Sequence, residues 1–286
     1  MRAVLIAGPT ASGKSALALS RARAEGGVIV NTDALQVYDG LHLITARPSA
    51  AEMAEVPHRL YGTVPPETRF STGEWARAAG ELIASEDRPL FFVGGTGLYF
   101  EALTKGFADV PEVPTAHVAA AEAELAGLDG EARARLIAAR DPEMAARLKA
   151  PDPQRVARAL AVKAATGKSL AWFQDRTHSP LLENFEIERI VLNPDRAVLR
   201  QRIADRFHTM FAEGAVPEVE ALLSRQLNPA LPVMKAIGVP EITAMLAGDI
   251  APAVAVDRAI IATRQYAKRQ RTWFRGRMAD WSWIET

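Results

Sequence analysis

The sequence predicts an α/β fold: a P-loop-type parallel sheet core flanked by helices, with a helical insertion domain. The first observation behind this is the apolar run RAVLIAG, which leads through a glycine loop into the helical pattern KSALALSRARAE. The second is that buried-strand patterns recur, as VIVNTD and PLFFVGG, with helical segments between them. The third is a long stretch after residue 110 that has helical spacing and no strand pattern. Strands that alternate with helices form parallel sheets, which bind ligands beyond the carboxyl ends of their strands.

A length of 286 residues fits one large domain or a core with a smaller insertion, and 49% apolar residues suffice for a buried core. The formal net charge is zero, so an argument for a nucleic-acid partner must come from local clusters of charge. The absence of cysteine excludes disulfides, thiolate catalysis and Cys-based zinc sites. No stretch approaches the roughly 20 apolar residues of a membrane helix, and the N-terminal run leads into a loop rather than a signal-peptide cleavage site. We therefore expect a cytoplasmic protein without a membrane segment.

The helical stretch divides the chain into three parts. Residues 1–110 and 184–286 are expected to form the core, and residues 111–183 the insertion. After the insertion, the strand pattern FEIERIVLN returns the chain to the core, which is expected to end in helices.

Three helix starts carry recognisable caps. Ser71 and Glu74 match a capping box at the start of a core helix. In the insertion, two helices begin at Asp141 and Asp152, each an N-cap aspartate with proline at the first helical position.

The first glycine loop fits the phosphate-binding pattern G-x-x-x-x-G-K-[ST], and residues 2–33 around it form one βαβ unit. The loop residues are Gly8, Pro9, Thr10, Ala11, Ser12, Gly13, Lys14 and Ser15. Backbone N–H groups of such a loop, and of the helix N-terminus that follows, donate to phosphate oxygens. Lys14 supplies a point charge, and the Ser15 hydroxyl is placed to ligate Mg²⁺.

Enzymes that hydrolyse nucleoside triphosphates typically hold Mg²⁺ with an acidic residue at a second strand end as well. The candidate strand PLFFVGGTG ends in Gly94, Gly95 and Thr96, without a carboxylate. The loop is therefore suited to holding a diphosphate that departs as a leaving group.

Asp33 lies 19 residues after Lys14, at the carboxyl end of what we expect to be the neighbouring strand. A carboxylate there can accept a proton from an incoming nucleophile, but it can equally be a turn or N-cap aspartate. Gly94 and Gly95 permit close approach of the backbone to a ligand, and Thr96 offers a hydroxyl, although a tight turn is an equally common reason for such glycines.

Positive charge gathers in RQYAKRQRTWFRGR, residues 264–277, which holds six Lys or Arg residues, no acid and three aromatic residues. This composition is typical of a nucleic-acid contact, although a solvated helix face with aromatics in the core explains it as well. A second cluster, Arg155 and Arg158, shares one face of a capped helix. On another helix Arg202 and Arg206 lie four residues apart, where one or both can face a diphosphate or form surface ion pairs.

Taken together, these motifs resemble the tRNA dimethylallyltransferase family, also called tRNA isopentenyltransferases. The resemblance runs nearly from end to end, through GPTASGKS, NTDALQVYDGL, TARPS, PH at 57–58, VGGTGLY, DPQRVARAL, RQRIADRF and TRQYAKRQRTWFR. That family transfers a dimethylallyl group from dimethylallyl diphosphate to the exocyclic amine of the adenosine immediately 3′ of the anticodon, using Mg²⁺ and releasing diphosphate. The resemblance implies the same substrates and cofactor here, with the anticodon stem-loop of tRNA as the partner, and we expect a monomer.

The resemblance also implies roles for particular residues. Thr10–Ser15 should bind the diphosphate, Asp33 should be the general base, Thr96 should position the reacting groups, and Arg202 or Arg206 should contact the diphosphate. The residues expected to contact tRNA are Asp33, Ala34, Leu35, Gln36, Thr96, Gln154, Arg155, Val156, Ala157, Arg158, Lys268, Arg269 and Arg271. The target base would have to leave its stack, and the insertion would embrace the stem-loop by its shape and phosphates.

The sequence departs from the family pattern at Ala34, where a serine is usual, at Arg47, where lysine is more frequent, and at Val239, where an aromatic residue is common. None of these removes a group needed for the transfer, but the first removes a hydroxyl near the target base.

Three other hypotheses remain. A small-molecule P-loop kinase would not need the basic, aromatic C-terminal stretch. An isopentenyltransferase acting on free adenine nucleotides would lack the helical insertion. A nucleic-acid-binding module with a degenerate nucleotide site is disfavoured by the intact Lys14 and Ser15.

Overall fold

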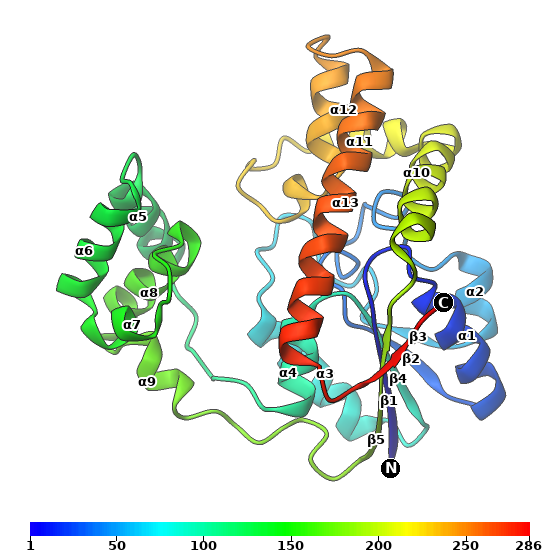
Figure 1. The fold of residues 1–286 in the computed structure, drawn as a ribbon, viewed down its shortest axis with the longest axis horizontal. Helices are drawn as coiled ribbons and strands as arrows, with labels where there is room; N and C mark the ends of the chain where they lie inside the picture. The colour runs from blue at the N-terminus through cyan, green and yellow to red at the C-terminus, as the bar shows by residue number, and fades with distance from the viewer. The chain divides into compact units, whose positions relative to one another are not determined.

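The computed structural model describes residues 1–286, which form two compact units (Figure 1). One unit combines Met1–Thr104 with Leu181–Thr286, and the other is Lys105–Pro180. The insertion was expected at residues 111–183. The second unit begins six residues before the expected start and ends three residues before the expected end.

The first unit is built on a six-stranded parallel sheet with the strand order β3-β2-β4-β1-β5-β6. The strands are β1 (Arg2–Ala7), β2 (Val28–Asn31), β3 (His58–Arg59), β4 (Leu90–Gly94), β5 (Glu186–Leu192) and β6 (Ser282–Ile284). Because every pairing is parallel, the loops that follow the strands emerge at one edge of the sheet. The phosphate loop, the turn at Asp33 and the second glycine loop follow β1, β2 and β4 at this edge.

The prediction that Asp33 follows the strand beside β1 is wrong. β4 lies between β1 and β2, pairing Ala3 with Leu90 on one side and Val28 with Leu90 on the other. The physical reason is that β4 is apolar and buried along its whole length, and such a strand is most stable in the middle of a sheet that helices cover on both faces. The second glycine loop is therefore placed between the phosphate loop and Asp33.

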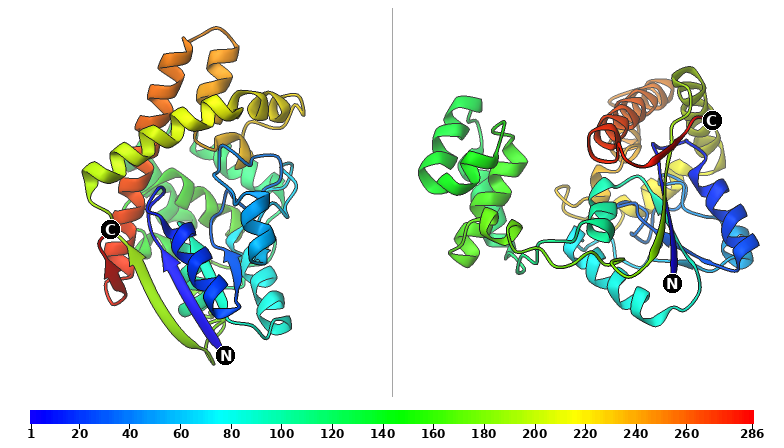
Figure 2. Two further views of the ribbon diagram at one scale, coloured as in Figure 1. Left: turned by 90° about the vertical axis from the view of Figure 1, so that its right-hand side faces the viewer. Right: turned by 60° about the horizontal axis from the view of Figure 1, so that its bottom comes forward.

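Helices cover both faces of this sheet, with α1 and α3 on opposite sides (Figure 2). The helices of this unit are α1 (Lys14–Glu25), α2 (Ala50–Glu55), α3 (Thr72–Ser85), α4 (Gly97–Thr104), α10 (Arg196–Glu213), α11 (Ala215–Leu223), α12 (Val239–Leu246) and α13 (Pro252–Arg277), with a 3₁₀ turn η1 (Val233–Lys235). Alternate residues of β1 and β4, such as Val4, Ile6 and Phe91, pack against Ala18 and Ala22 of α1 in one buried cluster. The resulting core fixes β1 and α1, and so the loop between them.

The capping box at the start of α3 is confirmed. The Ser71 hydroxyl accepts a hydrogen bond from the Glu74 amide at 3.2 Å, and the Glu74 carboxylate accepts one from the Ser71 amide at 2.7 Å. At the other end of the chain, the expectation that the core finishes in helices missed β6, which pairs with β5. A three-residue edge strand is too short to leave a pattern in the sequence, because main-chain pairing alone defines it.

The second unit is helical, as the spacing predicts. It contains α5 (Thr115–Leu125), α6 (Gly130–Arg140), α7 (Pro142–Arg147), α8 (Pro153–Thr166) and α9 (Leu170–Gln174) around its own apolar core. Asp141 and Asp152 are N-caps, accepting from the amides of Met144 at 3.2 Å and Arg155 at 3.0 Å, and each is followed by proline. None of the helices in either unit combines the length and apolar composition that spanning a bilayer requires.

Candidate active site

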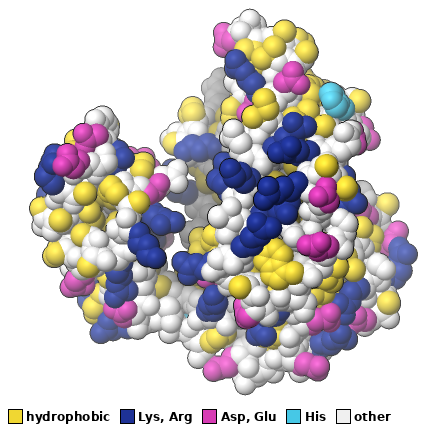
Figure 3. Space-filling view, in the orientation of Figure 1, with side chains coloured by type: hydrophobic (Ala, Val, Ile, Leu, Met, Phe, Trp, Pro, Cys, Tyr) yellow, Lys and Arg dark blue, Asp and Glu magenta, His cyan; other side chains and the backbone are white.

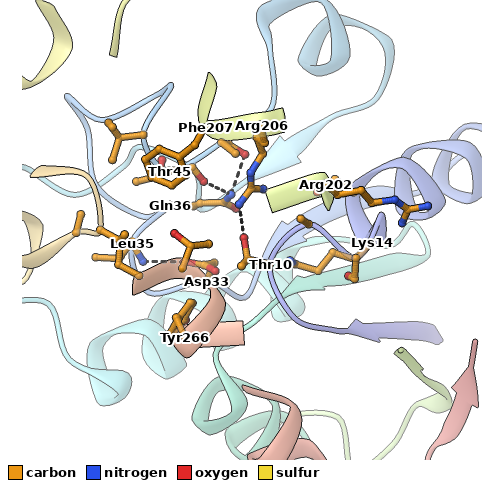
Figure 4. A pocket seen from close by; sticks show the side chains of 18 of the residues that line it. Thr10, Lys14, Asp33, Leu35, Gln36, Thr45, Arg202, Arg206, Phe207 and Tyr266 are labelled. Atoms are coloured by element: carbon orange, nitrogen blue, oxygen red, sulfur yellow. Dashed lines mark hydrogen bonds between the residues drawn. The ribbon is translucent and has the colours of Figure 1, made fainter. Parts of the chain in front are cut away.

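A cavity of about 420 Å³ opens at the carboxyl edge of the sheet (Figure 4). Six segments line it: the phosphate loop, the turn after β2, the loop before α2, helix α10, the turn between η1 and α12, and helix α13. The lining residues are Thr10, Ala11, Ser12, Gly13, Lys14, Ser15, Asp33, Leu35, Gln36, Ile44, Thr45, Ala46, Arg202, Arg206, Phe207, Ala236, Ile237, Thr263 and Tyr266. The cavity thus brings together six of the eight predicted loop residues, the predicted base and both candidate arginines.

The phosphate loop adopts a conformation that exposes its amides. Ala11 and Gly13 have positive φ angles of 63° and 90°, and α1 begins at Lys14 without a side-chain cap on its first turn. The first-turn N–H groups therefore have no intrahelical acceptor and remain available to an anion. Gly8 and Pro9, also predicted to bind phosphate, do not line the cavity; a Cβ on Gly8 would lie 2.7 Å from the Ser12 hydroxyl, so this glycine closes the loop.

Positive charge in this cavity is buried and only partly compensated. Burial lowers the pKa of Lys14 from 10.5 to about 8, although the Asp33 charge opposes this shift, while Arg206 adds to it. Burial also lowers the pKa of the Arg206 guanidinium. The Ser12 hydroxyl and Arg206 Nε are buried without a hydrogen-bond partner. Unpaired donors and desolvated cations around one cavity are the features expected of a site for an anionic ligand.

The structure places the two candidate arginines differently. Arg206 donates a hydrogen bond to the Thr10 hydroxyl and points toward the phosphate loop (Figure 4). Arg202 lines the same cavity but is exposed. Arg206 is therefore the arginine that is held against the loop.

Asp33 is held by a buried asparagine that sequence reasoning missed. The Asn31 side chain accepts a hydrogen bond from the Asp33 amide at 2.8 Å and donates one to the Asp33 carbonyl at 3.0 Å. The only signal in the sequence was a polar residue at the end of an otherwise apolar strand. Asp33 Oδ1 accepts from the Leu35 amide at 3.0 Å, so Asp33 is a turn aspartate and a cavity residue at once.

Thr96 supports this turn from the side. Its hydroxyl accepts a hydrogen bond from the Ala34 amide at 2.9 Å, and its amide donates to the Thr32 carbonyl at 3.1 Å. Neither Thr96 nor Ala34 lines the cavity. In this structure the Thr96 hydroxyl fixes the backbone beside Asp33.

The two glycines before Thr96 are required by protein contacts. A Cβ on Gly94 would lie 2.2 Å from the Thr32 backbone, and one on Gly95 would lie 2.1 Å from Gln270 Nε2. These glycines therefore permit close contact with Thr32 and Gln270 of the protein itself. The sequence had suggested close approach of the backbone to a ligand, or a tight turn.

One wall of the cavity is apolar, and two polar side chains hold it in place. Apolar side chains line this wall: Leu35, Ile44, Phe207, Ala236 and Ile237, with the ring of Tyr266. Gln36 donates to the carbonyls of Thr45 at 2.8 Å and Ala46 at 2.9 Å. The Glu218 carboxylate of α11 accepts from the amides of His42, Leu43 at 2.8 Å and Ile44 at 2.9 Å. Burial raises the pKa of the Tyr266 phenol, which is consistent with a largely dehydrated wall.

The basic stretch of α13 has two faces. Ala267, Gln270 and Phe274 are buried, whereas Lys268 and Arg269 are exposed. The outward face joins α10 in a groove of about 450 Å³ that contains six basic residues: Arg196, Arg200, Arg264, Lys268, Arg271 and Arg275. Figure 3 shows Lys and Arg side chains gathered over α13. The interpretation as a solvated helix face with an aromatic residue in the core is confirmed for Phe274, and the nucleic-acid contact stays a prediction.

The remaining predicted contacts lie on α8 in the second unit. Gln154, Arg155 and Arg158 are exposed there. Val156 and Ala157 are buried in the apolar core of that unit, so their side chains are not available to a partner.

The chain is similar to known proteins over nearly its whole length. A family model described as "IPP transferase" matches residues 36–277, and one described as "Isopentenyl transferase" matches residues 1–65. A tRNA dimethylallyltransferase of Chelativorans sp. (strain BNC1) is 52% identical and covers 98% of this chain and 97% of the relative. That of Rhizobium meliloti (strain 1021) is 48% identical and covers 99% and 95%. The chain belongs to the IPP transferase family.

Solved structures of this family share the fold. The tRNA isopentenylpyrophosphate transferase of Bacillus halodurans is 31% identical with a TM-score of 0.69, covering 99% of this chain and 89% of its own. A eukaryotic dimethylallyltransferase acting on tRNA has a TM-score of 0.81 at 24% identity, over 100% of this chain and 74% of its own, which shows the common fold. The predicted α/β fold and the predicted family are confirmed.

The departures from the family pattern are accommodated in different ways. Ala34 contributes a backbone amide, which Thr96 binds, so this interaction is independent of the missing hydroxyl. Arg47 donates to the Tyr38 carbonyl at 3.1 Å and does not line the cavity of this transferase. Val239 is buried at the start of α12.

Proposed function

We propose that this protein transfers a dimethylallyl group from dimethylallyl diphosphate to the exocyclic amine of the adenosine immediately 3′ of the anticodon in tRNA, releasing diphosphate. The observation that carries the proposal is a single cavity with a cationic end at the phosphate loop, an apolar wall, and Asp33. An allylic diphosphate has the same two parts, an anionic head and a short apolar tail.

In the proposed reaction, the amine nitrogen forms a bond to the first carbon of the dimethylallyl group while the bond from that carbon to the diphosphate oxygen breaks. The bonding electrons leave with the diphosphate, whose charge Lys14, Arg206 and the loop amides stabilise. The amine loses its proton to Asp33. Because Oδ1 of Asp33 already accepts from the Leu35 amide, we assign Oδ2 as the proton acceptor.

Mg²⁺ is the cofactor that we propose. The Ser15 hydroxyl lines the cavity, and a hydroxyl with diphosphate oxygens and water forms the all-oxygen shell that this cation prefers. No cluster of three His, Cys, Asp or Glu side chains is present, so the protein itself would supply few of the ligands. When bound, the cation would neutralise charge on the departing diphosphate.

We propose the anticodon stem-loop of tRNA as the macromolecular partner, contacted by the exposed basic residues of α13 and α8 and by the turn Asp33–Gln36. The positive charge of the basic residues on α13 and α8 is complementary to the phosphate backbone.

The test is incubation of the protein with radiolabelled dimethylallyl diphosphate, Mg²⁺ and tRNAs that carry adenosine next to the anticodon. We expect label in tRNA that depends on the protein and on adenosine at that position. Absence of label in any tRNA, together with ATP-dependent phosphorylation of a small metabolite, would overturn the proposal in favour of a kinase. Label in adenine nucleotides alone would favour a free-nucleotide transferase.

A further inference from the structure

Gln270 is a buried polar residue in the middle of the basic stretch of α13. The residue is 6% exposed, whereas its neighbours Lys268 and Arg269 are exposed. An amide side chain buried inside a helix face normally has a specific pair of partners, because an unpaired one would be costly.

The two ends of the Gln270 amide bind two different loops. Oε1 accepts a hydrogen bond from the Thr10 amide of the phosphate loop at 2.9 Å. Nε2 donates to the Gly95 carbonyl of the second glycine loop at 3.1 Å. One side chain therefore bridges the loop after β1 and the loop after β4, across their junction at the sheet edge.

The second glycine loop is in turn connected to Asp33. The Thr96 hydroxyl binds the Ala34 amide, and a Cβ on Gly95 would lie 3.5 Å from Asp33 Oδ2. The start of α4, directly after this loop, packs closely against Trp273 of α13, whose ring would lie 2.2 Å from a Cβ on Gly97. Gln270 thus stands in a chain of contacts that runs from the phosphate loop to the carboxylate.

We propose that Gln270 is a positioning residue, which holds the phosphate loop at a fixed distance from Asp33. The diphosphate leaving group and the base are then both aligned with the same pair of bound substrates. This inference rests on the proposed function. Because the Thr10 amide donates to Gln270, the groups that remain to bind phosphate are the amides after Thr10, Lys14 and Arg206. The side chain acts through the two loops and touches neither reacting atom.

The test compares Gln270→Met, which keeps the volume but removes both hydrogen bonds, with the wild-type protein under single-turnover conditions. Misplacement of reacting groups by about 1 Å costs on the order of 100-fold in rate, so we expect the transfer rate at saturating substrates to fall about 10- to 100-fold. The dissociation constant for tRNA should change less than about threefold, because the exposed basic side chains remain. Gln270→Glu retains the acceptor for Thr10 and should have an intermediate rate.

A second variant reaches the same contact from the opposite side. Gly95→Ala places a methyl group 2.1 Å from Gln270 Nε2 and must displace the amide, although the backbone at Gly95 does not have the positive φ angle that would exclude alanine. We expect the same loss of rate with unchanged tRNA affinity. The matched controls are Gly276→Ala, where a Cβ meets open space in α13, and Gln201→Met on the exposed face of α10.

Coupling to Asp33 separates positioning from general destabilisation. If Gln270 aligns the leaving group with the base, Gln270→Met should cost much less in an Asp33→Asn background than in the wild type. Equal losses in both backgrounds, an unchanged rate in Gln270→Met, or a loss that only follows weaker tRNA binding would each overturn the inference. Failure of the proposed function itself would appear separately, as a wild-type protein that labels no tRNA.

Discussion

Asp33 has two roles. Its Oδ1 stabilises a turn by accepting from the Leu35 amide, and the residue also lines the cavity. Asn31 binds the Asp33 backbone on both sides, and Thr96 binds the next amide. The position of the carboxylate is therefore set by neighbours that do not themselves line the cavity. Such preorganisation lets a group act without first being ordered by the substrate.

Replacement of Asp33 by asparagine should abolish most of the activity without disturbing the turn. The asparagine oxygen can still accept from the Leu35 amide, but it cannot take a proton. General bases contribute about 10²- to 10⁴-fold in rate, so we expect the transfer rate to fall within that range. Binding of inorganic diphosphate, measured by calorimetry, should stay within about threefold of wild type. A transfer rate near wild type would show that another group is the base.

Lys14 should make diphosphate binding depend on pH. Its pKa in the folded, ligand-free protein is about 8 instead of 10.5, so the folded protein binds fewer protons than the unfolded chain between these values. Desolvation of Lys14 therefore reduces stability below about pH 8, and this cost disappears as the pH rises through 10.5. A bound diphosphate needs the protonated form, so affinity should weaken above about pH 8.

The measurement is the dissociation constant of inorganic diphosphate between pH 6.5 and pH 9.5, compared with Lys14→Met. The titration of diphosphate itself is common to both proteins and cancels in the ratio of their constants. We expect the dissociation constant of Lys14→Met divided by that of the wild type to fall by up to about tenfold per pH unit above pH 8, because the wild type loses the charge that the variant never had. A ratio that is constant with pH would mean that Lys14 remains protonated throughout.

At the scale of elements, the cavity depends on how loops are attached to helices far away in the sequence. Glu218 of α11 accepts three amides of the loop before α2, and Gln36 binds two carbonyls of the same loop. The apolar wall at Ile44 is thus fixed by hydrogen bonds rather than by packing alone.

Glu218→Ala should loosen this loop. Loss of the carboxylate leaves amides of His42, Leu43 and Ile44 without their acceptor, which costs about 1–3 kcal/mol for buried groups. We expect the free energy of unfolding, measured with urea, to fall by that amount, and the KM for the allylic diphosphate to rise. Glu220→Ala, an exposed neighbour on the same helix, is the control and should change neither quantity. Equal effects of the two variants would show that the loop does not depend on the carboxylate.

At the scale of the whole molecule, α13 joins the catalytic cavity to a basic outer surface. Its inner side chains line the cavity or bind the glycine loops, and its outer side chains join α10 in a groove with six basic residues. One helix therefore serves both the reacting groups and the expected RNA partner.

Lys268→Gln and Arg271→Gln should each weaken tRNA binding in a salt-dependent way. A contact to one phosphate contributes about 0.7–0.9 to the slope of log K against log salt concentration, so each variant should reduce that slope by about this amount. The rate at saturating tRNA should change little. Arg59→Gln, which removes one exposed charge from β3 at the opposite edge of the sheet from β6, is the control. An unchanged slope in both α13 variants would place the RNA elsewhere.

The sequence by itself determined the features that depend on local residue patterns. The loop Gly8–Ser15, the bounds of α1, the caps at Ser71, Asp141 and Asp152, and the helical insertion are all of this kind, since a few neighbouring residues define each. The order of several motifs along the chain was also enough to predict the family. The candidate residues Asp33, Arg202 and Arg206 were predicted to lie near the phosphate loop, and the structure brings them to one cavity.

Only the tertiary structure decided how these pieces meet. Strand order placed β4 between β1 and β2, and it depends on burial of both strand faces rather than on sequence separation. The roles of Glu218 and Gln270 depend on hydrogen bonds to other segments; Gln270 and Thr10 are 260 residues apart. A pattern read within a short window carries no information about such partners, because they become neighbours only when the chain folds.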